Sequence, residues 1–172
     1  FIYVGIFARG RGLNLILDTF QSPSIKSHIV FLGYGDLEEE LLEASKKHNN
    51  IHIHQAVVYD RVVSIVKSAD VGLALIEDVS LSDYFSLPNK LFEYAFSGIP
   101  VLASKFPDME RVVSQYKLGV TTELNTLSIQ KKIIEMENTK IIETPKIGTL
   151  KALSWAKQEQ KLVSFYREIW DN

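Results

Sequence analysis

The segment from Gly5 to Gly12, GIFARGRG, has the composition of an anion-binding turn. It follows a short apolar run and precedes an amphipathic one, so we expect it to join a strand to a helix. Glycine lets a backbone approach a ligand closely, and arginine can grip phosphate with two parallel hydrogen bonds. The glycine spacing does not match the dinucleotide-binding fingerprint. Two interpretations stay open: Arg9, Gly10, Arg11 and Gly12 bind a phosphate, or the segment is a flexible loop with solvated arginines.

The stretch from Leu87 to Val101 is the most informative part of the chain. Pro88 suits the first position of a helix, which puts Asn89 and Lys90 in the first turn. A cation there is unfavourable against the helix dipole unless an anion binds beside it. Glu93 lies one turn further along the same face. Either Lys90 binds a phosphate and Glu93 a sugar diol, or the two form a surface ion pair worth roughly a few tenths of a kcal/mol.

Two further features are weaker. The turn Gly33-Tyr34-Gly35-Asp36 is either a tight turn with a capping aspartate or backbone that lines a ligand cleft. His52 and His54 share one face of an expected strand. Neither a cysteine nor a nearby carboxylate completes a ligand set, so we expect no metal site.

Short β-branched runs, which we expect to form strands, alternate along the chain with longer amphipathic segments, which we expect to form helices. These strands and helices would position the candidate site residues. In a doubly wound sheet, ligands bind beyond the C-terminal ends of the strands, where these turns are expected to lie. The pattern predicts a Rossmann-like, doubly wound α/β domain with a parallel sheet of about six strands. The expected strands are Ile2–Gly5, His28–Leu32, Ile51–His54, Val71–Ile76, Pro100–Ala103 and Gly119–Thr121, and the expected helices are Leu13–Phe20, Leu37–Lys47, Asp60–Lys67, Asn89–Phe96, Met109–Tyr116 and Ser128–Asn138.

Local signals support several helix boundaries. Asp36 is expected to cap a helix whose first turn carries Glu38 and Glu39. Gly98-Ile99-Pro100 ends one helix and leads into a strand. The tail Ile147–Trp170 is helical in pattern, and it either packs on its own domain or extends toward another.

Composition narrows the class of protein. A chain of 172 residues, 46% hydrophobic and 23% charged, fits one domain of ordinary size. A net charge of −2 gives no electrostatic reason to expect nucleic acid as a partner. The lack of cysteine excludes disulfides and fits a reducing cytoplasm. No apolar run approaches the roughly 18–20 residues of a membrane span, and the strand-like start at Phe1 predicts a chain that begins in mid-protein.

Taken together, these motifs resemble the C-terminal domain of GT-B glycosyltransferases of the group 1, or family 4, type. Gly5 to Phe20 follows the spacing of that family's first motif, with Arg11-Gly12 at its Lys-Gly position. Glu93 and the run from Gly98 to Val101 match the second half of its second motif. Pro88-Asn89-Lys90 with Glu93-Tyr94 resembles a variant common among transferases of bacterial capsular and other surface polysaccharides. The resemblance covers nearly the whole chain. The remaining matches are Ala69-Asp70-Val71 with Leu73, and Ser154-Trp155.

Two positions depart from the family pattern. Ile6 stands where the first motif has an arginine, and Arg9 is a candidate to replace that diphosphate contact. Phe85 stands where the second motif has its first glutamate, a residue that often contacts the transferred sugar. Phe85 would be a core or cleft-lining aromatic, with Asp83 or Ser86 as alternative sugar contacts.

The resemblance implies that residues 1–172 form the nucleotide-sugar-binding C-terminal domain of a retaining glycosyltransferase. The donor would be a nucleoside-diphosphate sugar, with UDP favoured over GDP, and no metal or other cofactor is implied. Arg11 and Lys90, helped by Arg9, would stabilise the departing diphosphate. Glu93 would hold the ribose, Asn89 would belong to the same binding set, and the run Gln55-Ala56-Val57 would meet the base.

The same resemblance places the acceptor site in an N-terminal domain outside this chain, so the chain alone is expected to be inactive. The acceptor would be a glycan or a lipid-linked glycan. The enzyme would be cytoplasmic. Peripheral attachment to the inner face of the membrane, through the missing half, stays open. Two alternatives remain: a nucleotide-sugar 2-epimerase with the same two-domain architecture, and a non-catalytic α/β nucleotide-binding module.

Overall fold

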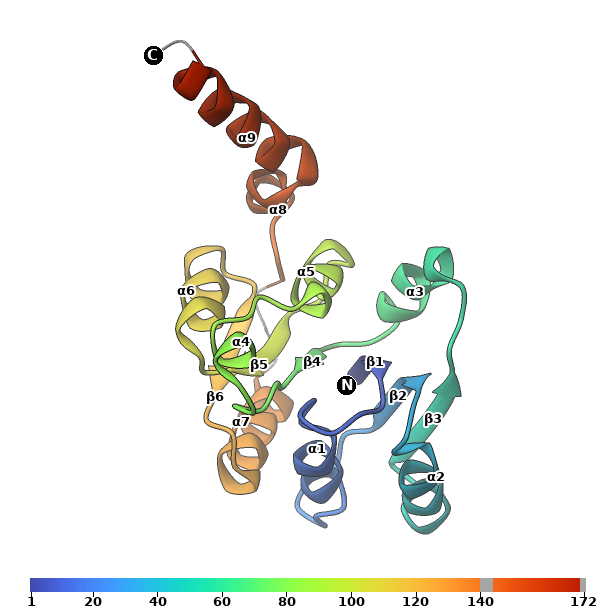
Figure 1. The fold of residues 1–172 in the computed structure, drawn as a ribbon. Helices are drawn as coiled ribbons and strands as arrows, with labels where there is room; N and C mark the ends of the chain where they lie inside the picture. Colours follow the sequence, from blue (N-terminus) through green and yellow to red (C-terminus); the bar gives the residue numbers. More distant parts are fainter. Residues whose placement is uncertain (140–143, 171–172) are drawn as a thin grey trace.

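The computed structural model describes residues 1–139 and 144–170, and a six-stranded parallel sheet forms its centre (Figure 1). The strand order is β3-β2-β1-β4-β5-β6, the order of dinucleotide-binding folds. The predicted doubly wound α/β fold is therefore confirmed. The strands are β1 (Ile2–Ile6), β2 (Ile29–Tyr34), β3 (Ile51–Gln55), β4 (Gly72–Ala74), β5 (Val101–Ser104) and β6 (Gly119–Thr122).

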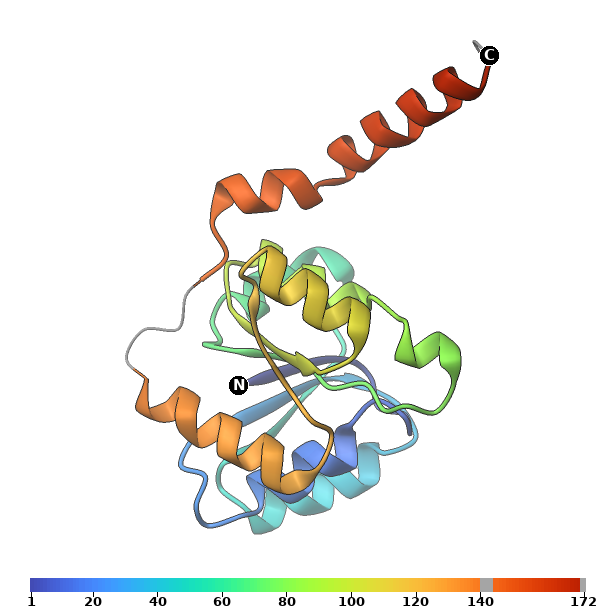
Figure 2. The same ribbon diagram turned by 90° about the vertical axis from the view of Figure 1, so that its left-hand side faces the viewer.

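Helices cover both faces of this sheet (Figures 1 and 2). One apolar cluster, which includes Phe7, Phe31 and Ile133, fills the face under α1, α2 and α7. A second cluster, which includes Leu91 and Val101, fills the face under α3, α5 and α6. The helices are α1 (Leu13–Phe20), α2 (Glu38–Lys47) and α7 (Thr126–Asn138) on the first face and α3 (Tyr59–Val66), α5 (Asn89–Phe96) and α6 (Pro107–Gln115) on the second.

Strand β4 is shorter than the predicted Val71–Ile76. Beyond Ala74, the side chain of Ser104 replaces the ladder of hydrogen bonds. Its hydroxyl accepts from the Ile76 N–H at 2.7 Å and donates to the Ile76 carbonyl at 2.8 Å. The chain then forms a short helix, α4 (Leu81–Tyr84), which the sequence did not predict.

Two predicted helix caps are wrong in detail. Asp36 does not cap α2, because Leu37 occupies the cap position and no side-chain hydrogen bond forms there. The Leu37 N–H instead donates to the Phe7 carbonyl, which ties the turn to the end of β1. Pro88 precedes α5 as its N-cap, with an extended ψ of 144°, rather than occupying the first helical position.

The C-terminal tail is two helices, α8 (Ile147–Leu153) and α9 (Trp155–Trp170), which are separated by an extended Ser154. Leu150 and Leu153 of α8 pack against the second apolar cluster, so α8 belongs to this domain. Helix α9 extends away from the domain (Figure 2), and the Trp170 side chain is 84% exposed. No helix within residues 1–139 and 144–170 is long and apolar enough to span a membrane.

Candidate functional site

The candidate site lies where the strand order reverses, between β1 and β4. These strands pair at a single register position, Ile2 with Gly72. Further along the two strands, the Val4 N–H donates to the Tyr94 hydroxyl at 2.9 Å, and that hydroxyl donates to the Leu73 carbonyl at 3.2 Å. The Tyr94 hydroxyl therefore stands between the two strands and replaces their direct hydrogen bond, which opens the sheet toward its C-terminal edge.

Gly72 makes this arrangement possible. A Cβ atom added at Gly72 would lie 2.2 Å from the Tyr94 ring, so the ring can lie on β4 only because no side chain is present there. Burial raises the pKa of Tyr94 above its ordinary value, which keeps the bridging hydroxyl neutral.

Lys90 reaches into this opening from α5. Its Nζ atom lies 3.8 Å from the centroid of the Tyr3 ring on β1, and 3.6 Å from where a Cβ on Gly5 would stand. An ammonium over a ring face is attracted by the negative face of the π-system. Burial nevertheless lowers the pKa of Lys90 to about 7, helped by the positive charge of Arg11 and opposed by Glu93.

The structure brings Arg11 to the same edge as Lys90. Arg11 influences the pKa of both Lys90 and Tyr3, and it lies 3.8 Å from the carboxylate of Asp83 in α4. The Arg11 side chain is 45% exposed, so a ligand can still reach it. The two cations predicted for the diphosphate thus converge on one face; their binding roles remain predictions.

Helix α5 also presents Glu93 and an open N-terminus. The Glu93 side chain is half-buried and has no hydrogen bond or ion pair with the described residues. The predicted surface pair between Lys90 and Glu93 is therefore not formed. Asn89 is exposed at the start of the helix, and Pro88 supplies no side-chain cap. The first backbone N–H groups of α5 can thus receive an anion.

The first turn is anchored rather than flexible. The Gly12 N–H donates to Glu77 Oε1 at 3.0 Å, and the Glu77 N–H donates to the Gly10 carbonyl at 3.0 Å. Gly12 has a φ of 71°, and a Cβ there would lie 2.2 Å from the Leu75 carbonyl oxygen. Arg9 is exposed and lines a hollow of about 190 Å³ with Gly10 and Glu77. The start of α1 therefore already holds an internal carboxylate, which the sequence analysis did not identify.

The segment expected to meet the base lies close to α5. Gln55 ends β3 and is exposed, and its carbonyl oxygen lies 2.7 Å from His54 Nδ1. Val57 is half-buried against the second apolar cluster. Helix α3, which follows this segment, packs beside α5 (Figure 1), so Val57 lies on the same side of the sheet as Lys90 and Glu93. Gln55 follows Ile51 and Ile53 at alternate positions of β3, which puts its side chain on the side of the first apolar cluster.

The two departures from the family pattern are both at this edge. Ile6 is 56% exposed, and Lys90 Nζ lies beside the neighbouring Gly5. Phe85 is 55% exposed and packs edge-on against Tyr84, so it is not a core residue. Of the alternative sugar contacts, Asp83 is engaged by Arg11, whereas the buried Ser86 hydroxyl has no hydrogen-bond partner among the described residues.

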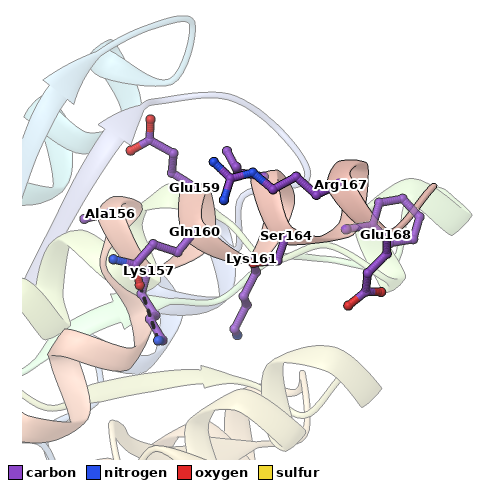
Figure 3. Close-up of a pocket in the computed structure, with 10 residues that line it drawn as sticks. Ala156, Lys157, Glu159, Gln160, Lys161, Ser164, Arg167 and Glu168 are labelled. Atoms are coloured by element: carbon purple, nitrogen blue, oxygen red, sulfur yellow. Dashed lines mark hydrogen bonds between the residues drawn. The ribbon is translucent and has the colours of Figure 1, made fainter. Parts of the chain in front are cut away.

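Other parts of the surface offer less chemistry. His52 pairs with His28 at 2.8 Å rather than with His54. The part of the chain that the structure describes holds no group of three potential metal ligands. A hollow of about 750 Å³ is lined by side chains of α9 alone (Figure 3), far from the strand ends that gather the candidate site residues.

An open, doubly wound domain with cations and an unpaired carboxylate at its switch point has the layout of a nucleotide-binding domain. Residues 1–138 match the family described as glycosyl transferases group 1. The chain therefore belongs to the group 1 glycosyltransferase family. No curated protein sequence matches it significantly.

Solved structures of glycosyltransferases share this fold. The chain is similar to AviGT4, a glycosyltransferase involved in avilamycin A biosynthesis, with 14% identity, a TM-score of 0.74 and coverage of 98% of this chain and 51% of that one. It is similar to sucrose-phosphate synthase from Thermosynechococcus elongatus, with 16% identity, a TM-score of 0.77 and coverage of 99% and 45%. It is also similar to Anabaena HepE in complex with UDP, with 16% identity, a TM-score of 0.62 and coverage of 98% and 47%. The chain thus spans about half the length of these proteins.

Proposed function

We propose that this chain is the donor-binding, C-terminal half of a retaining glycosyltransferase that uses a UDP-sugar. The observation that carries the proposal is the convergence of Arg11, Lys90 and Glu93 at the β1–β4 switch point. Membership of the group 1 family and the UDP complex of the similar HepE structure support it. The half-length match supports a further half outside this chain. We propose that this half is N-terminal and binds a glycan or lipid-linked acceptor, and that the enzyme acts in the biosynthesis of a surface polysaccharide.

The proposed chemistry breaks the bond between the sugar C1 and the β-phosphate oxygen. A bond from C1 to the acceptor oxygen forms, and the proton of the acceptor hydroxyl passes to the departing diphosphate oxygen. Negative charge builds on the departing diphosphate, where Arg11, Lys90 and the open N–H groups of α5 can stabilise it. The site is an open edge rather than a closed cavity, so a second half is needed to exclude water and hold the acceptor.

Glu93 would accept hydrogen bonds from the two ribose hydroxyls. An ionised carboxylate is acceptor-only, whereas glutamine replaces one acceptor oxygen with donors. Glu93→Gln should therefore cost about 1–3 kcal/mol in UDP affinity, and it should discriminate less between UDP and 2′-deoxy-UDP. Titration calorimetry with both nucleotides measures each effect.

The matched control is Glu135→Gln on α7, which covers the opposite face of the sheet. Its UDP affinity should equal that of the unaltered chain. Equal UDP affinity in the Glu93→Gln variant, together with a lowered melting temperature, would assign Glu93 a structural role and contradict the proposal.

A further inference from the structure

Lys90 sits where a diphosphate needs a cation, yet its surroundings disfavour the charged amine. Three charged or titratable groups surround it: Tyr3 from β1, Arg11 from the first turn, and Glu93 from its own helix. Within the described residues Lys90 has no ion pair. Its Nζ atom lies over the Tyr3 ring, and Gly5 leaves room beside it.

We propose that binding of a nucleoside diphosphate at this edge is coupled to the uptake of one proton by Lys90, which Tyr3 positions in the opening between β1 and β4. The inference rests on the proposed function of the site. In the step, the neutral amine of Lys90 gains one N–H bond, and the proton comes from the buffer. No other bond forms or breaks.

The direction of this coupling follows from the groups around Lys90. In the free protein, burial and Arg11 favour the neutral amine, with a pKa of about 7. A diphosphate beside Nζ adds negative charge, which favours the ammonium and raises the pKa again. At pH 8 the free amine would be roughly nine-tenths neutral, and it would be charged in the complex. Lys90 should therefore take up most of one proton when the ligand binds at pH 8, and almost none when it binds at pH 6.

Titration calorimetry with UDP at pH 8, in Tris and in HEPES, counts the protons exchanged because the two buffers differ in ionisation enthalpy. The UDP phosphates are already ionised at this pH, since a terminal phosphate titrates near pH 6. We expect the unaltered chain to take up most of a proton. At UDP concentrations that saturate it, Lys90→Arg should take up no proton, because arginine is always charged.

The outcomes separate the two proposals. UDP binding without proton uptake would overturn the inference and leave the proposed function standing. Proton uptake that persists in Lys90→Arg would also overturn it, because another group would then be the acceptor. No UDP binding by the unaltered chain would remove both.

The positioning role of Tyr3 has its own test. Tyr3→Phe keeps the ring face but loses the hydroxyl, which donates to the Ile6 carbonyl at 2.9 Å, whereas Tyr3→Leu removes the ring. Proton uptake should be kept in the phenylalanine variant. It should fall in the leucine variant, with UDP affinity reduced about 5- to 30-fold, because a lysine released to solvent is already charged. Equal uptake in both variants would contradict the role of the ring.

Carbon NMR of the lysine Cε signals tests the same idea in the unaltered chain, without relying on a variant that folds. The Lys90 signal, assigned by its loss in Lys90→Arg, should titrate near pH 7 in the free protein and at clearly higher pH with saturating UDP. A free-state titration near the ordinary lysine value would overturn the inference.

Discussion

Replacing Tyr94 with phenylalanine removes one oxygen atom from the boundary between β1 and β4. Both hydrogen bonds of that oxygen are buried, at 2.9 Å from Val4 N–H and 3.2 Å from the Leu73 carbonyl. A buried polar group left unpaired costs about 1–3 kcal/mol. Because the contact with Leu73 is the longer one and a carbonyl tolerates under-satisfaction better than an N–H, we expect a total loss of about 2–4 kcal/mol. That is a large part of the roughly 5–15 kcal/mol by which such domains are stable.

Urea unfolding followed by circular dichroism measures this loss as a lower midpoint with an unchanged m-value. Tyr116→Phe is the matched control, because the half-buried Tyr116 side chain makes no hydrogen bond with the described residues. The control should lie within about 0.5 kcal/mol of the unaltered chain. If Tyr94→Phe were equally stable, the strands would have closed and bonded directly, and the hydroxyl would not be what holds them apart.

Two further predictions concern the cations. Arg11→Ala should weaken UDP binding by roughly 1.5–3 kcal/mol at low salt, and the loss should shrink as salt screens the charge. Arg111→Ala on α6 is the control. A loss of affinity in Arg11→Ala that does not depend on salt would refute the electrostatic role of Arg11. Lys90→Met should be more stable than the unaltered chain at pH 6 by on the order of 2–4 kcal/mol. The pKa of Lys90 is about 7 in the folded protein and 10.5 in the unfolded chain. The unfolded state therefore binds more protons than the folded state between these two pH values. The unaltered chain should thus gain stability as pH rises from 7 to 10.5. Urea unfolding measured across that pH range should show a shrinking difference in the free energy of unfolding between Lys90→Met and the unaltered chain.

Much of the fold could be predicted because its signals are local. Leu13–Phe20 and Asn89–Phe96 are helical with the predicted bounds, since each has an apolar stripe at helical spacing. All six strands were expected from short β-branched runs. The exceptions depend on contacts between distant segments: β4 is cut short by the Ser104 side chain, and α2 starts late because Leu37 bonds to Phe7.

The candidate site was only partly predictable for the same reason. The residue types of Arg11, Lys90 and Glu93 suggested an anion and a diol, and the topology brings them to one edge. Glu77 could not be identified, because its bond to Gly12 joins positions 65 residues apart. The depressed pKa of Lys90 was also hidden, since it results from burial that only the packed structure defines.

Gly72 is a sequence signal for the opening in the sheet that was not recognised before the structure. Glycine inside an apolar strand weakens it, unless another group must approach the backbone closely. Here that group is the Tyr94 ring, whose hydroxyl separates β1 from β4. Tyr94 directly follows Glu93 on α5, and Lys90 lies one turn earlier on the same helix. The contact that opens the sheet therefore also fixes the helix that carries the lysine and the carboxylate, so a change at Gly72 should disturb stability and ligand binding together.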